Sequence, residues 1–452
     1  MAFKDLLKHL PEVESPVEKL GFNEKAKWTL IILVAFFVLA NVPLYALSNN
    51  ALSRFENLAV ILGTDFGSII SLGIGPIVMA SIILQLLVGS KLIDIDTSSK
   101  EGKMFFQGIQ KLLVLFFIIF EASIYVLMKG LEATPEFAWL VILQLCLGGL
   151  AIVFMDEVSH KWGFGSGVSL FIAAGVSWRL FTSLFQFLGV QGTFEPTGRL
   201  WVLVNAIING NQDTAILAGS AIIVTAIIFL IIVWAQSLKI EVPLSFDRIR
   251  GYGMKWPLAF FYTSVIPVIL VSALSANIQL FAGLLENWLG HATILGGFSG
   301  GIPTSGFIFW INPVDILQAV ITDSFTRNMI FQSIGHVLFY VSFSVLFALF
   351  WVKTSGMDAQ SQAANIMKSG LTIPGFRKDP RILESVLERY ILPLTIMGGT
   401  SIGLLAALSD VSGTLVGGTS ILLVVMIMYQ FYTNIAQQHS MDMYPALKKL
   451  IK

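Results

Sequence analysis

The side chains that could do chemistry are few, and most of them lie within apolar stretches. Glu121 is a carboxylic acid inside the apolar stretch 108–128, and Asn277 and Gln279 lie inside another, 257–283. Ionisable groups at membrane depth often carry protons or cations. Ion-coupled transporters usually need several such acids, however, and the sequence offers no second acid at a comparable depth. We therefore favour a single acid that is hydrogen-bonded between helices.

The sequence contains none of the patterns that indicate an enzyme or a metal site. It lacks a P-loop, GxSxG and HExxH motifs and paired acids, and its five histidines follow no ligand spacing. GFGSG at 163–167 follows an apolar stretch rather than a strand, so we do not expect it to bind phosphate. Cys146 is the only cysteine, which excludes an intrachain disulfide. We expect no enzymatic activity and no cofactor.

The composition is that of an integral membrane protein. Of the 452 residues, 55% are hydrophobic and 12% are charged. Soluble domains carry about 25% charged residues. A soluble chain of this length could not cover its surface with so few charges. The formal net charge is zero, so the overall charge predicts no acidic partner.

Ten stretches are long and apolar enough to cross a bilayer, which requires roughly 20 mostly apolar residues. An all-α membrane protein with ten transmembrane helices is therefore predicted. Residues 1–27 mix acids, bases and prolines with isolated leucines, which predicts an amphipathic segment on the membrane surface rather than a cleavable signal. The ten stretches are 28–47, 72–90, 108–128, 137–155, 167–189, 214–235, 257–283, 330–352, 388–408 and 414–434.

The basic residues indicate the orientation of these spans. Of the 28 Lys and Arg, 23 fall on the side that holds the N-terminus and four on the opposite side. Cytoplasmic segments collect Lys and Arg, so the N-terminus, the loops 236–256 and 353–387 and the tail 435–452 are expected in the cytoplasm. Asp156 and Glu157 end the fourth span at that interface, and we expect water to solvate both.

Residues 52–90 are too long for one span and too broken for two. Residues 53–62 suit a short amphipathic helix, but glycines and Pro76 follow where a membrane helix should be continuous. Irregular backbone at membrane depth is tolerated inside protein or beside a water-filled cavity, so one interpretation places this segment at a central cavity. An external loop followed by an ordinary span explains the pattern equally well.

A faint internal repeat relates two halves of the chain. Residues 73–86 resemble residues 265–280 in their proline, their β-branched run and their Gln-Leu ending. Each segment falls in the second span of a five-span half, so the halves are 28–189 and 214–434, joined by an external loop over 190–213. Corresponding interrupted helices in two halves indicate inverted repeats with a site between them.

Six stretches carry a resemblance to a known family. Along these stretches, and from residue 11 to the C-terminus, the chain resembles SecY, the large subunit of the Sec protein-conducting channel, in its archaeal form. The resemblance implies ten helices in two inverted, pseudo-symmetric halves, located in the cell membrane. The stretches are LGIGPIVMASIILQLLVGS (72–90), GFGSGVSLFIAAGVS (163–177), KIEVPLS (239–245), IPVILVSALSANIQLF (266–281), GFRKDPRILESVLERYI (375–391) and GGTSILL (417–423).

The resemblance also implies which residues form the conducting path. The broken second segment becomes a plug over residues 53–64, whose apolar side chains are Phe55, Leu58, Ala59 and Leu62. The first four ring residues form two pairs with a spacing of four, which places two β-branched side chains on one helix face. Ordinary bundle packing would explain any one of them alone. The implied pore ring is Ile74, Val78, Val168, Ile172, Ile269 and Leu423.

A lateral gate is implied between spans two and three on one side and spans seven and eight on the other. Its polar cluster would include Glu121 and Asn277, and Met79 stands where the family usually carries a hydroxyl side chain. The sequence therefore departs from the family pattern at this position. We expect Glu121 and Asn277 to hydrogen-bond to each other, because each is a costly polar group at depth.

The implied function is passive. Polar chains pass through the ring, apolar segments leave through the gate into lipid, and a partner supplies the driving force. The implied partners are a gamma- or SecE-type and a beta-type small membrane subunit, the ribosome, and signal peptides with the polypeptides that follow them. The implied ribosome-docking residues lie in the two long cytoplasmic loops, where arginine can bind RNA phosphate with a bidentate fork. They are Arg248, Arg250, Arg377 and Lys378.

A secondary transporter of a small solute is the alternative. It would also explain ten spans, broken helices and inverted repeats. It predicts a compact polar or charged site near the middle of the membrane. The sequence offers only Glu121, Asn277 and two glutamines there.

Overall fold

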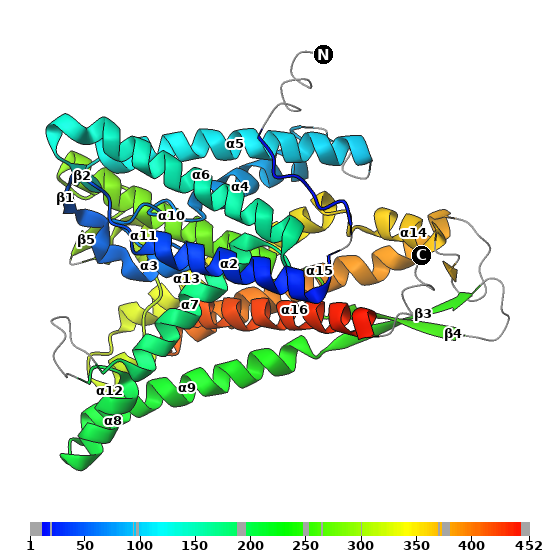
Figure 1. Cartoon of the computed structure of the whole chain (residues 1–452). Coiled ribbons are helices and arrows are strands. Elements are labelled where there is room, and N and C mark those ends of the chain that lie inside the picture. The colour runs from blue at the N-terminus through cyan, green and yellow to red at the C-terminus, as the bar shows by residue number, and fades with distance from the viewer. Residues whose placement is uncertain are drawn as a thin grey trace.

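Long helices, roughly side by side, make up most of the chain, and small sheets lie at both ends of the bundle (Figure 1). The computed structural model describes residues 11–18, 20–93, 95, 99–187, 196–246, 253–263, 265–299, 301–368, 371–372 and 380–443. The long helices are α2 (Phe22–Ala40), α4 (Gly75–Gly89), α5 (Lys100–Leu127), α6 (Ala138–Trp162), α7 (Gly167–Phe185), α9 (Gln212–Gln236), α10 (Ile266–Leu289), α13 (Arg327–Thr354), α15 (Pro380–Val411) and α16 (Gly418–Met443).

Shorter elements connect these helices. The strands form three small antiparallel sheets, with β1 paired to β2, β3 between β4 and β7, and β5 paired to β6. The short helices are η1 (Ala51–Phe55), α3 (Glu56–Ile61), η2 (Pro135–Phe137), α8 (Arg199–Ile208), α11 (Gly306–Ile311), α12 (Ile316–Ile321) and α14 (Ala359–Lys368). The strands are β1 (Leu47–Asn50), β2 (Leu131–Ala133), β3 (Lys239–Phe246), β4 (Gly253–Ala259), β5 (Gly297–Ser299), β6 (Ile302–Ser305) and β7 (Leu371–Thr372).

Eight helices in the described part of the chain are long and apolar enough to cross a membrane. They include all the long helices except α2 and α4. The α4 helix has 15 residues, which is shorter than the roughly 20 that span a bilayer core. The α2 helix has 19 residues and carries Glu24, Lys25 and Lys27 near its start.

Apolar side chains cover the outside of this bundle as well as its interior. Ile223 and Leu230 on α9 are each at least 60% exposed, and Phe116 on α5 and Leu30 on α2 are exposed as well. Large exposed apolar surfaces are unusual for soluble monomers. Their distribution over long helices fits contact with lipid, where the backbone hydrogen bonds must be satisfied within each helix.

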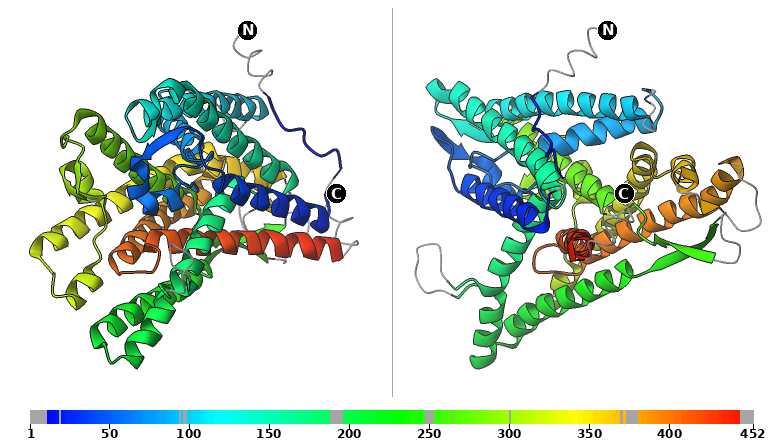
Figure 2. Two further views of the ribbon diagram at one scale, coloured as in Figure 1. Left: turned by 60° about the vertical axis from the view of Figure 1, so that its left-hand side comes forward. Right: turned by 45° about the vertical axis from the view of Figure 1, so that its right-hand side comes forward.

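Two loops expected from the sequence contain regular structure. The expected cytoplasmic loop 236–256 holds β3 and part of β4, whose hairpin extends past the helices at one end (Figures 1 and 2). Because residues up to Ala259 pair as β4, α10 begins at Ile266 rather than at residue 257. The expected external loop 190–213 contains α8, which packs against α9 at the edge of the bundle (Figure 2).

Residues 1–10 of the expected surface segment 1–27 lie outside the described residues. Within the described part, residues 11–16 form no regular structure, and α2 begins at Phe22. This segment is tied to the end of α6, where Lys161 pairs with Glu12 and Trp162 donates to the carbonyl of Glu14 at 2.9 Å. The hydrogen bond from Lys161 lowers the pKa of the Glu12 carboxyl.

Candidate functional site

The chain is interrupted between α3 and α4, as one interpretation of the sequence required. Gly63, Gly67 and Gly73 adopt φ values of 55°, 103° and 53°. Side chains with a Cβ rarely adopt this left-handed region, so glycine permits the irregular path. Helix resumes at Gly75, with Pro76 in its first positions, where the missing N–H costs nothing.

The short helix before this interruption lies inside the protein. Phe55, Leu58, Ala59 and Leu62 are all buried and belong to the main hydrophobic core. The α3 helix packs against α7 from the first half of the chain and against α10 from the second. The carbonyl of Leu62 accepts a hydrogen bond from the backbone N–H of Ile74 at 2.9 Å. The interrupted segment therefore fills space between the two halves.

The six expected ring residues also belong to that core. Five of them are buried in the main hydrophobic core. Val168 is half-buried and packs against that core. Ile74 immediately precedes α4, and the remaining five lie in the first two turns of α4, α7, α10 and α16. Burial in one cluster agrees with a closed constriction and equally with ordinary bundle packing.

Two aspartates hold the beginnings of two of these helices. The Oδ1 atom of Asp156, near the end of α6, accepts the backbone N–H of Val168 at 2.9 Å. The Oδ1 atom of Asp410, near the end of α15, accepts the backbone N–H of Thr419 at 2.7 Å. A carboxylate at this position satisfies an otherwise unpaired N–H, and the positive end of the helix dipole stabilises its negative charge. The same contact thus recurs between the fourth and fifth long helices of each half.

The sequence interpretation missed both roles. Asp156 and Glu157 were expected to be solvated, but Asp156 accepts an N–H in the first turn of α7. Glu157 pairs with Lys111 and accepts the backbone N–H of Val13 at 2.9 Å. The expectation failed because it considered depth alone and not the neighbouring helix. The signal in the sequence was an acid in the last turns of one helix, ahead of a Gly-containing connection to the next. These connections are GFGSG at 163–167 after Asp156 and SGTLVGG at 412–418 after Asp410.

The expected hydrogen bond between Glu121 and Asn277 is not formed. Both side chains are buried, but the Asn277 amide donates to the carbonyl of Ala273 at 2.9 Å within α10. Neither carboxylate oxygen of Glu121 has a hydrogen-bond partner among the described residues. The expectation was wrong because a helical asparagine can satisfy its donor on its own preceding turn.

Glu121 lies instead against the beginning of α4. A Cβ placed on Gly75 would lie 3.0 Å from the Oε2 atom of Glu121, so the glycine lets the carboxylate approach. The positive end of the α4 dipole makes this a favourable position for an acid. Helix α4 packs directly against α10 and α13, the two helices expected across the gate, and Met79 is half-buried in α4.

The expected ribosome-docking residues Arg248, Arg250, Arg377 and Lys378 lie outside the described residues. The strands that flank them are described, however. Ser245 of β3 pairs with Thr372 of β7, which places the two long loops in one three-stranded sheet.

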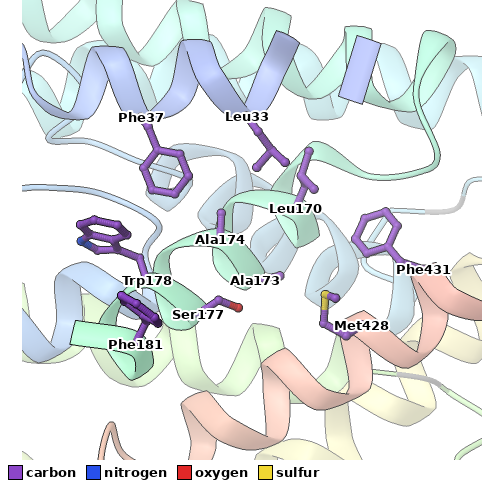
Figure 3. A pocket seen from close by; sticks show the side chains of 10 residues that line it. All are labelled: Leu33, Phe37, Leu170, Ala173, Ala174, Ser177, Trp178, Phe181, Met428 and Phe431. Carbon is purple, nitrogen blue, oxygen red and sulfur yellow. The ribbon is translucent and has the colours of Figure 1, made fainter. Parts of the chain in front are cut away.

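An apolar cavity of about 400 Å³ lies between α2, α7 and α16 (Figure 3). Phe37 projects into it from α2, Met428 and Phe431 face it from α16, and Trp178 and Phe181 line it from α7 (Figure 3). Both of these α7 side chains are exposed. The arrangement can accept an apolar body such as a lipid chain or another helix.

Comparisons with known proteins agree with this architecture. The model of the SecY family matches residues 68–432. The chain is 43% identical to the protein translocase subunit SecY of Methanothermobacter thermautotrophicus, over 99% of this chain and 98% of that protein.

Two solved structures are similar in fold. One is described as a SecY protein whose plug domain stabilises the closed state of the translocation channel and maintains a membrane seal. It has a TM-score of 0.83 and 38% identity, with 98% of each chain covered. The other is Sec61 in the canine ribosome-channel complex from the endoplasmic reticulum, with a TM-score of 0.81, 38% identity and 98% of each chain covered.

Proposed function

The chain belongs to the SecY family, and from this premise we propose how it moves polypeptides. It is a multi-pass membrane protein and a passive protein-conducting channel, not an enzyme. The small-solute transporter is not favoured, because the relatives are translocase subunits and translocation channels.

We propose ten spans, with α2 and α4 added to the eight long apolar helices. Both added helices pack among the others, α2 against α6 and α4 against α5 and α10. The distribution of Lys and Arg supports a location in the cell membrane with both termini and the β3–β4 hairpin in the cytoplasm. Ten spans make two halves of five, and because five is odd, the two halves cross the membrane in opposite orientations.

The conducting path runs through a ring of Ile74, Val78, Val168, Ile172, Ile269 and Leu423, closed by the plug at residues 53–64. The observation that carries this proposal is the position of α3 between a helix of each half, joined to Ile74 by the hydrogen bond to Leu62. Aliphatic side chains can close around a peptide without binding it strongly. A hydrophobic constriction also impedes water and ions.

The lateral gate lies where α4 meets α10 and α13. An apolar client segment separates these helices and leaves between them into lipid, while a polar chain continues through the ring. Glu121 is the buried acid at this contact, and it has no hydrogen-bond partner among the described side chains. Because an unpaired buried polar group is costly, its hydration on opening would favour the open state.

The two cytoplasmic loops dock the ribosome through Arg248, Arg250, Arg377 and Lys378. The shared sheet of β4, β3 and β7 supports this role, because it brings the two loops onto one platform. The Sec61 relative was solved in a ribosome-channel complex, which supports the same partner here. Arginine suits the contact because its planar fork matches phosphate.

The apolar cavity between α2, α7 and α16 receives the membrane helix of the gamma- or SecE-type subunit. Ala173 and Ala174 line it, and such small residues let helices approach closely within a bilayer. The exposed Trp178 and Phe181 then provide the apolar contact area. A beta-type subunit is the second partner, and we assign it no position.

Purification from native membranes in mild detergent tests these partners. We expect single-span subunits and ribosomes to co-purify with the channel. Ala174→Phe should fill the cavity and remove the gamma-type subunit, whereas Ile223→Phe on the exposed face of α9 should not. Retention of that subunit by Ala174→Phe would place it elsewhere, and solute uptake without partners would favour a transporter.

A further inference from the structure

Arg54 connects the start of the plug to the far end of the gate helix α10. We propose that Arg54 and Glu286 form a latch that couples release of the plug to movement of α10, so that the seal and the gate open together. The proposal rests on the plug and the gate proposed above. It adds a specific ion pair through which movement of the gate helix would be transmitted to the plug.

The guanidinium of Arg54 contacts one face of the last two turns of α10. Its Nη2 atom donates to the Oδ1 atom of Asn287 at 3.1 Å and to the carbonyl of Gly283 at 3.4 Å. It also lies 3.8 Å from the Oε2 atom of Glu286. Residues three and four apart in a helix are neighbours on its surface, so one side chain reaches all three.

Aromatic packing fixes the arginine in this position. The guanidinium lies 4.8 Å from the ring centre of Phe55 and 5.5 Å from that of Phe298, and the two rings are 5.0 Å apart. Arginine is attracted to aromatic rings at these distances. A Cβ on Gly283 would lie 2.6 Å from the ring of Phe55, so the glycine in α10 makes room for the plug. Glu286 is itself oriented by the backbone N–H of Phe298, at 2.9 Å from its Oε1 atom.

The two sides of the latch belong to different halves of the chain. Just before Arg54, the backbone N–H groups of Ala51 and Leu52 donate to the carbonyl of Gly130 at 2.9 and 3.3 Å. β1 pairs with β2, which follows α5. Arg54 is therefore anchored to the first half, whereas Glu286 moves with α10. Any displacement of α10 that opens the gate must stretch or break their contact.

The contact between Arg54 and Glu286 is weak enough to break during opening. The Nε atom of Arg54 and the Nδ2 atom of Asn287 are buried and have no hydrogen-bond partner among the described residues. The side chains of Arg54 and Glu286 remain 28% and 19% exposed, so water can replace the lost contact. Partly exposed ion pairs contribute little, and one such pair shifts an equilibrium by roughly a few-fold. That strength suits a contact that must break in every cycle.

A charge exchange tests the latch in the complete complex. Arg54→Glu and Glu286→Arg should each raise the resting ion conductance in planar bilayers roughly two- to fivefold, together with the acceptance of clients with weak signal sequences. The double variant restores an ion pair of reversed polarity and should return both readouts toward wild type. Lys129→Glu changes a nearby exposed base outside the latch and should leave both readouts unchanged.

Deletion of residues 53–62 separates this proposal from the plug itself. If the deletion raises the conductance but the single variants do not, or if the double variant is no better than the singles, the latch is wrong and the plug stands. If the deletion causes no leak, the plug and the latch both fail. Recovery in the double variant is the decisive result, because a misfolded channel would not regain its seal.

Discussion

The carboxylate of Asp156 accepts a hydrogen bond from the backbone N–H of Val168, at 2.9 Å. Asp410 makes the equivalent contact to Thr419 at the beginning of α16, four residues before Leu423. Each contact fixes the start of a helix whose first two turns carry proposed ring residues. The position of the proposed ring would thus depend on acids that do not belong to it.

Asp156→Ala should loosen the seal as well as the fold. Loss of a side-chain acceptor at the start of a helix costs about 1 kcal/mol, and here it also frees the backbone N–H of Val168. We expect a higher resting conductance and a lower melting temperature, with Asp156→Asn affected less because it keeps one oxygen acceptor.

Ser99→Ala is the matched control for this variant. Ser99 accepts the N–H of Gly102 at 3.1 Å and caps α5, which carries no proposed ring residue. It should lower stability without raising conductance. Equal conductance of Asp156→Ala and wild type would contradict a role of the cap in positioning the ring.

A polar side chain in the ring should relax the selection of clients. Ile172→Asn or Ile269→Asn hydrates the constriction and lowers the barrier to opening. We expect clients with weak signal sequences to be translocated several-fold better in a reconstituted assay. Ile232→Asn, a buried position in α9 outside the ring, should cost stability without this gain. Unchanged or stricter selection in both ring variants would argue against the ring.

Glu121→Gln should favour the closed gate and spare assembly. The variant keeps the shape of the side chain but removes an acid that has no hydrogen-bond partner among the described residues. Leaving a buried polar group unpaired costs about 1 kcal/mol or more, so we expect roughly a fivefold change in lateral release. Crosslinking of a signal peptide to lipid-exposed positions would measure it.

The same measurement tests whether Glu121 and Asn277 act independently. Asn277 bonds to its own helix through Ala273, so the effects of Glu121→Gln and Asn277→Ala should add in the double variant. A clearly non-additive result would show that the two side chains meet in another state of the gate. Loss of coupled ion transport in Glu121→Gln would favour the transporter.

Reversal of Arg248 and Arg377 to Glu should abolish co-sedimentation with ribosomes, while the protein still inserts and binds its small subunits. Wild-type binding should weaken as salt rises, because each phosphate contact releases counterions. Lys239→Glu changes an exposed base at the start of β3 and should retain binding. Wild-type binding by the double variant at near-physiological salt would mean that the loops only set the topology.

The sequence determined the properties that depend on local composition. The low charge, the long apolar stretches and the sided distribution of Lys and Arg identified a polytopic helical membrane protein, because each span must satisfy its own backbone and tolerate lipid. The breaks at Gly63, Gly67 and Gly73 were visible for the same local reason, since glycine permits φ values that other residues avoid. The six stretches that resemble SecY then indicated the function.

Only the tertiary structure decided which polar groups meet. Arg54 and Glu286 are separated by more than 200 residues, and Asp156 could equally have faced water at the interface. Glu121 and Asn277 looked like natural partners by depth, but Asn277 satisfied its donor within α10 and Glu121 packed against Gly75. Depth and periodicity specify which helix face a residue occupies. The neighbour on that face depends on how helices distant in the sequence pack together, which no local pattern encodes.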